Sequence, residues 1–249
     1  MKKFIKQPKF RFILFLTAFF LLTGILGLIF LPFIRNLENA EYREIFSGWV
    51  AGLGVKGLLI LFGIQMLQIV VAVIPGGPVQ LIAGAAYGTW GGLAILEAGC
   101  FAATMTVFFM VRKFGLPFVR RFFGEDVIGA WGFLSNEKRT ALVTFILFLI
   151  PGTPKDTLTY LAPLSKLSLI QFTLISVIAR FPAILSSTAM GDAAMQGKKI
   201  LFFVVFGITA VIGILGIQFR DKIIGKFSSG GGLRKKPPAE DSFGIGRKS

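Results

Sequence analysis

The sequence contains no histidine and a single cysteine, Cys100. Without histidine the chain lacks the commonest metal ligand and the usual general base, and a lone cysteine excludes an intramolecular disulfide. No P-loop motif is present, which argues against a pump driven directly by ATP. Because metal-ligand clusters and nucleophile elbows are also missing, an enzyme has little support. We therefore expect no catalytic activity, no metal and no cofactor.

Charged residues are missing from several long apolar runs. Residues 12–34 carry no charge over 23 positions, which is enough to cross a bilayer about 30 Å thick at about 1.5 Å per residue. This run is too long for a signal peptide and has no small-residue cleavage site after it, so it predicts a retained first span. Further candidate spans are 56–74, 91–111, 167–190 and 200–219. The fold class is therefore all-α, a polytopic membrane protein with about four transmembrane helices.

The net charge of +15 comes from a few basic segments. These are residues 1–11, 112–139 and the tail 220–249, and the positive-inside rule places all three, including both termini, in the cytoplasm. Attraction to the membrane surface explains such a tail; the alternative, nucleic-acid binding, is not expected of an integral membrane protein. The tail is predicted to be disordered. Residues 35–55 predict an interfacial amphipathic helix on the outer surface, or alternatively a solvated loop.

The same break occurs twice, as PGGP at 75–78 and PGTP at 151–154, each time after an apolar run. Proline removes a backbone donor and disfavours helix in the residue before it. Pro75, Gly76 and Pro78 therefore predict one interruption of the helix, and Pro151 and Pro154 predict a second. The alternative is that a short pattern has recurred by chance.

The charge distribution suggests how these interruptions lie in the membrane. If 56–74 crossed fully, the basic segment 112–139 would fall outside, so we expect 56–88 to enter from outside and return there. The apolar run 140–150 has only 11 residues, which suits a second re-entrant segment, entering from inside. The region 56–219 would then form an inverted repeat with two opposed re-entrant hairpins. Transporters of this kind bind substrate where the broken segments meet.

Five ionisable residues fall at or near membrane depth, where charges are costly and indicate a partner or a function. They are Glu97, Lys155, Asp156, Arg180 and Asp192. Glu97 and Arg180 are at similar depth, so we expect them to pair or to share a water-filled cavity that serves function. The alternative is a static ion pair that only holds two helices together. A buried Glu97 that loses its partner when substrate binds would take up a proton, which predicts proton coupling.

Lys155 and Asp156 follow the second break directly. If Pro154 begins a short helix, its first N–H groups favour an anion, and Lys155 adds a point charge suited to phosphate. The sequence thus predicts that a lipid phosphate binds at Gly152, Thr153 and Lys155. The alternative is a Lys155–Asp156 ion pair at the cytoplasmic mouth.

The segment PGGPVQLIAGAAYGTWGGLAILEAGCFAATMTVFFMVRKFG (75–115) resembles the DedA/VTT superfamily of SNARE-associated Golgi-type membrane proteins. The matching positions are Pro75-Gly76, Ala83-Gly84, Tyr87-Gly88, Gly92, Gly99, Phe108, Arg112 and Gly115. The segment 149–182, which begins LIPGTPKDTLTYLAPLSKLSLIQF and ends ARFP, is similar to the second Pro-x-x-Pro hairpin of that family and the helix after it. In total the resemblance covers about 56–192.

The resemblance implies two opposed re-entrant hairpins and the handling of lipids. Bacterial members are associated with recycling of polyprenyl phosphate, and eukaryotic relatives resemble phospholipid scramblases. The chain departs from the family at two places that bear on substrate and proton coupling. Phe148 stands where the family often has arginine, and Gly77 and Pro78 stand where DedA members often have an acidic residue.

Together these features predict a lipid translocase of the flippase or scramblase type that is not driven by ATP. We expect it in the bacterial plasma membrane, moving a phosphate-bearing lipid such as polyprenyl phosphate or a phospholipid, with proton coupling. Its partners would be membrane lipids, and the sequence leaves the oligomeric state open. The alternatives are a secondary permease for a small polar solute or ion and a non-transporting scaffold.

Overall fold

The computed structural model describes residues 35–37, 39–72, 74–123, 137–150 and 155–228, together with three single positions before residue 35. Every regular element within these ranges is a helix. The elements are α2 (Ala40–Val71), α3 (Gly76–Phe123), α5 (Glu137–Leu149), α6 (Lys155–Leu161), the single 3₁₀ turn η2 (Ala162–Leu164), α7 (Leu169–Met195) and α8 (Lys199–Ser228).

Within the described residues four helices are long and apolar enough to cross a membrane, which confirms the all-helical membrane fold. They are Ala40–Val71, Gly76–Arg121, Leu169–Met195 and Lys199–Gly216. The last three helices include most of the residues of the predicted spans 91–111, 167–190 and 200–219. The first helix in this list is α2, which covers a region where the sequence predicts an interfacial helix followed by one arm of a hairpin. The predicted first span, 12–34, falls almost entirely outside the described residues, as do the basic segment 1–11 and the end of the tail.

Helix α2 has two parts because the backbone bends at Gly54 (φ 48, ψ −132). It begins after Asn39, whose side chain accepts a hydrogen bond from the Glu41 N–H at 2.9 Å, a common way to satisfy an open helix start. It ends at Ala72, which is left-handed and donates its N–H to the Gln68 carbonyl. The bend lies next to the boundary predicted at residue 55.

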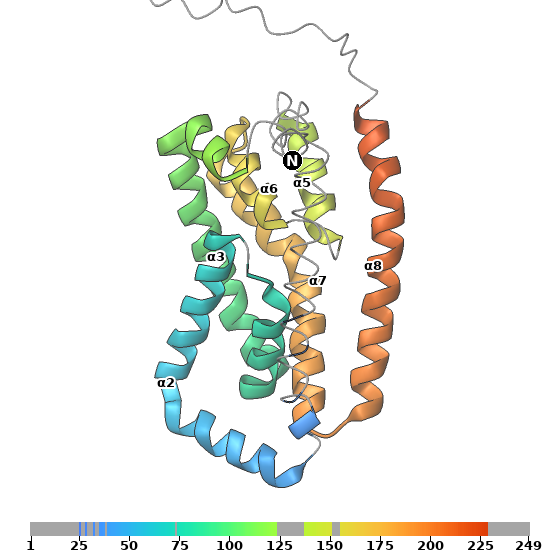
Figure 1. The fold of residues 1–249 in the computed structure, drawn as a ribbon. Coiled ribbons are helices and arrows are strands. Elements are labelled where there is room, and N and C mark those ends of the chain that lie inside the picture. Colours follow the sequence, from blue (N-terminus) through green and yellow to red (C-terminus); the bar gives the residue numbers. More distant parts are fainter. Residues whose placement is uncertain are drawn as a thin grey trace, which may run out of the picture.

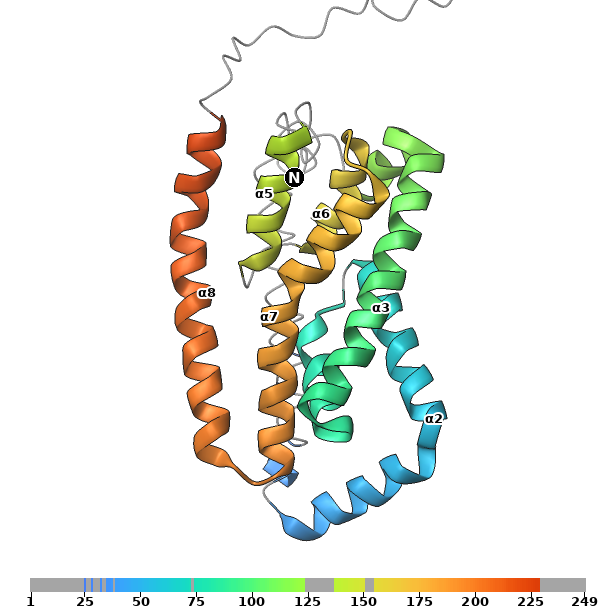
Figure 2. The same ribbon diagram turned by 180° about the vertical axis from the view of Figure 1, so that it is seen from behind.

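The first Pro-Gly motif separates α2 from α3, as its chemistry requires. Helix α3 begins at Gly76, directly after Pro75, and Pro78 lies in its first turn, where no backbone donor is needed. The chain then reverses at Gly88 (φ 71, ψ 174), a conformation that favours glycine. In Figures 1 and 2, α2 ends near mid-height, the first part of α3 runs back down, and the second part runs from the reversal to the top of the molecule.

Contacts with α7 fix this reversal. The Asp192 carboxylate accepts hydrogen bonds from the Thr89 N–H at 3.0 Å and the Thr89 hydroxyl at 2.7 Å, so it caps the part of α3 that begins after Gly88. At Gly84 and Gly191 the two helices approach so closely that a Cβ would overlap the backbone of the other helix. The first part of α3 and the end of α7 therefore form one tightly packed unit.

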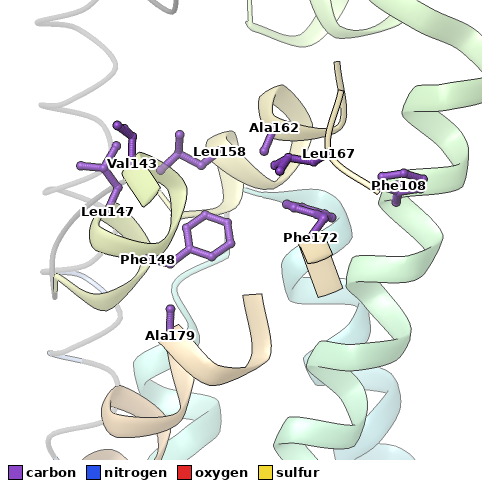
Figure 3. Packing of buried hydrophobic residues seen from close by; sticks show 9 residues of the cluster. All are labelled: Phe108, Val143, Leu147, Phe148, Leu158, Ala162, Leu167, Phe172 and Ala179. Carbon is purple, nitrogen blue, oxygen red and sulfur yellow. The ribbon is translucent and has the colours of Figure 1, made fainter. Parts of the chain in front are cut away.

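Helices α5 and α6 lie in the opposite half of the molecule from the bend of α2 and the reversal of α3 (Figure 1). They pack on α3 and α7 through an apolar cluster in which Phe148 is fully buried (Figure 3). The cluster consists of Phe108, Val143, Leu147, Phe148, Leu158, Ala162, Leu167, Phe172 and Ala179. Because α5 and α6 are both short, this packing must supply most of their stability.

The structure contains no membrane relative to which the predicted hairpins could be placed. Re-entrance and orientation therefore stay predictions. They can be tested at three positions of α3: Gly77 and Lys113, which are exposed, and Trp90, whose side chain is 71% exposed.

We expect opposite accessibility at the two ends of the long part of α3. In a Cys100→Ala background, a membrane-impermeant maleimide should label Trp90→Cys in intact cells and Lys113→Cys only after permeabilisation. Gly77→Cys should react from the same side as Trp90→Cys. Labelling of Lys113→Cys in intact cells would contradict the predicted topology.

Candidate functional site

Arg180 of α7 lies at the centre of the helices, with a side chain only 8% exposed. Its Nη1 donates to Asp156 Oδ1 at 3.0 Å and its Nη2 donates to Thr159 Oγ1 at 2.8 Å. The guanidinium carbon lies 5.0 Å from the centre of the Phe148 ring, within the range of a cation–π contact. Arg180 is thus bound by two residues of α6 and by one of α5.

A second set of contacts joins α6 to the end of α2. Asp156 uses its other oxygen, Oδ2, to accept a hydrogen bond from Gln68 Nε2 at 3.3 Å. The Tyr160 hydroxyl donates to the backbone carbonyl of Val70. The residues next to the first break and those after the second therefore meet directly, although they lie 88 and 90 positions apart in sequence.

Two more ionisable side chains complete a group that we call the central cluster: Glu97, Lys155, Asp156 and Arg180. Arg180 interacts electrostatically with both Glu97 and Lys155. With all four ionised, two positive and two negative charges balance. The cluster therefore concentrates charge inside the protein while remaining neutral as a whole.

Some polar atoms of the cluster and of the neighbouring Gln68 lack a hydrogen-bond partner among the described residues. They are both carboxylate oxygens of Glu97, Arg180 Nε and Gln68 Oε1, and all four are buried. Buried polar groups normally have partners because leaving one unpaired is costly. A polar head group could provide partners for these donors and acceptors, and a proton could bind the Glu97 carboxylate. The cluster therefore places unpartnered polar atoms inside an otherwise apolar bundle.

Polar contacts continue from the cluster along α3 and α7. The hydroxyls of Thr104 and Ser176 lie 3.0 Å apart, and buried Cys100 is close enough to interact with both of them and with Arg180. No group of three or more histidine, cysteine or acidic side chains that could hold a metal lies within the part of the chain that the structure describes.

The structure brings together four of the predicted site residues but corrects one pairing. We expected a Glu97–Arg180 pair as one possibility, whereas the carboxylate that bonds Arg180 is Asp156. Depth along two helices fixes only one coordinate, and the carboxylate that bonds Arg180 comes from a third helix, α6. The alternative Lys155–Asp156 pair is likewise not the bond that forms. Asp192 lies apart, capping Thr89 of α3.

The other predicted site residues belong to the two Pro-Gly motifs. At the first break Pro75 lies between α2 and α3, and Gly76 and Pro78 lie in the first turn of α3. The second break lies outside the described residues, and with it Pro151, Gly152, Thr153 and Pro154. The expected phosphate position at Gly152 and Thr153 therefore stays a prediction.

Sequence reasoning missed Gln68 and Thr159, which bind the ion pair directly. For Gln68 a signal was present, because Gln65 and Gln68 are the only side chains with polar groups in the apolar run 57–74, and both are nearly fully buried. Two amides three positions apart on one helix face indicate a polar contact inside a bundle. Thr159 carries no comparable signal, since threonine is common in apolar helices.

Removing the guanidinium should destabilise the fold, because Asp156 would be left without its counter-charge. Truncating one partner of a buried pair typically costs about 3–5 kcal/mol, and for Arg180→Met we expect about 3 kcal/mol since Asp156 is 22% exposed. Thermal unfolding in detergent would measure this. The double variant Asp156→Asn/Arg180→Met should recover part of the loss; a double variant less stable than Arg180→Met would show that the pair is not the cause.

A comparison with family models matches residues 74–193 to the VTT domain. The match contains the first break, Glu97, α6 and α7 up to Arg180 and beyond, and hence the whole central cluster. Comparisons with curated proteins and with solved structures yield no match.

Proposed function

We propose that this chain, a multi-pass membrane protein of the DedA/SNARE-associated family by its VTT domain, translocates a phosphate-bearing lipid across the membrane without ATP. The observation that carries the proposal is the central cluster, a neutral set of four charged side chains inside the bundle. Ionisable residues within membrane proteins are costly and mark substrate or ion pathways. Their position between the two broken segments is where transporters with inverted repeats bind substrate.

Lys155 and Arg180 are the candidate phosphate ligands. A guanidinium can bind a phosphate with two parallel hydrogen bonds, and a lysine binds it as a point charge. Arg180 has a fixed position in α7, and Lys155 is the first residue of α6, directly after the second break. The resemblance to lipid-handling relatives favours a lipid over a small solute, with polyprenyl phosphate and phospholipids as the candidates in the plasma membrane.

Reconstitution into liposomes tests the proposal. Labelled polyprenyl phosphate and labelled phospholipid are followed in parallel vesicles, and we expect at least one to cross faster than in protein-free vesicles. A protein that moves neither lipid but admits a small polar solute would instead be a permease, and the proposal would be wrong.

The Lys155→Ala variant should weaken binding of a phosphorylated lipid by about tenfold, the loss expected for one charge-assisted contact. Binding of the corresponding alcohol should be almost unchanged, because it carries no phosphate. Affinities can be compared by calorimetry in detergent. Lys56→Ala is a matched control, since Lys56 is an exposed lysine of α2. Equal losses for the phosphate and the alcohol would count against a phosphate contact.

Glu97 is the candidate for proton coupling, because neither of its buried oxygens has a hydrogen-bond partner among the described residues. Its proximity to Arg180 means that a phosphate arriving at Arg180 would favour the neutral acid at Glu97. In Glu97→Gln vesicles we expect transport that no longer responds to an imposed proton gradient. Transport by the variant that follows the gradient as the wild type does would exclude this role.

A further inference from the structure

We infer that Asp156 stands in for the anionic group of the substrate: it occupies Arg180 in the empty protein and is displaced when a phosphate binds. This inference rests on the proposed function and specifies how the site binds its ligand. It makes Asp156 a residue that competes with the substrate rather than one that attracts it.

The hydrogen bonds of Arg180 show why a phosphate and Asp156 must compete. Nη1 is bonded to Asp156 and Nη2 to Thr159, while Nε is buried with no partner among the described residues. A phosphate binds a guanidinium best through two donors at once. Each Nη carries a second N–H, but Asp156 and Thr159 already occupy the Nη1–Nη2 end of the guanidinium. A phosphate that binds this end through both nitrogens must therefore take the place of the Asp156 carboxylate.

The surroundings of the two residues restrain Asp156 less than they restrain Arg180. Arg180 is 8% exposed and lies within the 27-residue helix α7, with the Phe148 ring at 5.0 Å. Asp156 is 22% exposed and is the second residue of the seven-residue helix α6. Its second bond, to Gln68, is long at 3.3 Å. A ligand would therefore move the carboxylate rather than the guanidinium.

Exchange of one anion for another also avoids leaving the buried Arg180 guanidinium without a counter-charge. A buried guanidinium without a counter-charge is strongly destabilising, but an incoming phosphate replaces the carboxylate at the same donors. When the phosphate leaves, Asp156 can return, which limits how tightly the site holds its ligand. The carboxylate thus keeps Arg180 satisfied between binding events and promotes release.

Displacement of Asp156 has a second effect, because the same carboxylate accepts the hydrogen bond from Gln68. Movement away from Arg180 would also break this link between α2 and α6. An anion that binds Arg180 would therefore loosen the contact between the two broken segments, and its departure would restore that contact.

The Asp156→Asn variant tests the inference, because it keeps the size of the side chain and removes the competing charge. With the full-length protein in detergent, we expect geranylgeranyl phosphate to bind about tenfold more tightly than to the wild type. Binding of geranylgeraniol should not change. Asp192→Asn is the matched control, since it removes an acidic charge from α7 that caps Thr89 and makes no contact with Arg180.

Thr159→Val provides an independent variant that leaves every charge in place. It frees Nη2 of Arg180 and should tighten binding of geranylgeranyl phosphate by about two- to threefold, the effect of one uncharged hydrogen bond. If Asp156→Asn does not fold, the affinity of Thr159→Val for geranylgeranyl phosphate decides whether the inference stands. Unchanged or weaker binding by the variants that fold would overturn the inference.

These results are distinguishable from failure of the proposed function. A wild-type protein that neither binds nor transports any phosphorylated lipid would refute the function itself. A wild-type protein that transports such a lipid, combined with variants that bind it no more tightly, would refute only the competing role of Asp156.

Discussion

The ion pair between Arg180 and Asp156 is the contact on which the arrangement of the other helices depends. It connects α7 to α6 at 3.0 Å, and through Gln68 it connects both to the end of α2. An unpaired charge at this position would be far more costly than any single apolar contact nearby. The helices around it must therefore be placed so that the pair forms, and the interruptions at the two Pro-Gly motifs make that placement possible.

Phe148 gives a physical reason for one departure of this chain from its family. At this position, where the resemblance led us to expect an arginine, the aromatic ring is fully buried and faces the guanidinium of Arg180. A second arginine here would place two like charges side by side in a buried site. The ring instead offers a negative face without adding charge, and the balance of two positive and two negative side chains is preserved.

The same residues show what could be predicted from sequence and what could not. The first break followed from the backbone chemistry of Pro75, Gly76 and Pro78, and the central cluster followed from the rarity of charges in apolar segments. Position along a helix does not determine which neighbour a side chain meets, so Asp156 was not recognised as the partner of Arg180. The chain reverses at Gly88, where the hairpin 56–88 was expected to end. The carboxylate that caps this reversal was not predicted, because it comes from α7, 103 residues later.

The glycine contacts between α3 and α7 have a mechanical consequence. At Gly84 and Gly191 the two backbones touch without intervening side chains, so neither helix can slide or rotate there without steric overlap. This pair is consequently the stationary frame of the molecule. Any alternation between inward and outward access has to come from displacement of the segments that lean on it, namely the upper part of α2 and the α5–α6 pair.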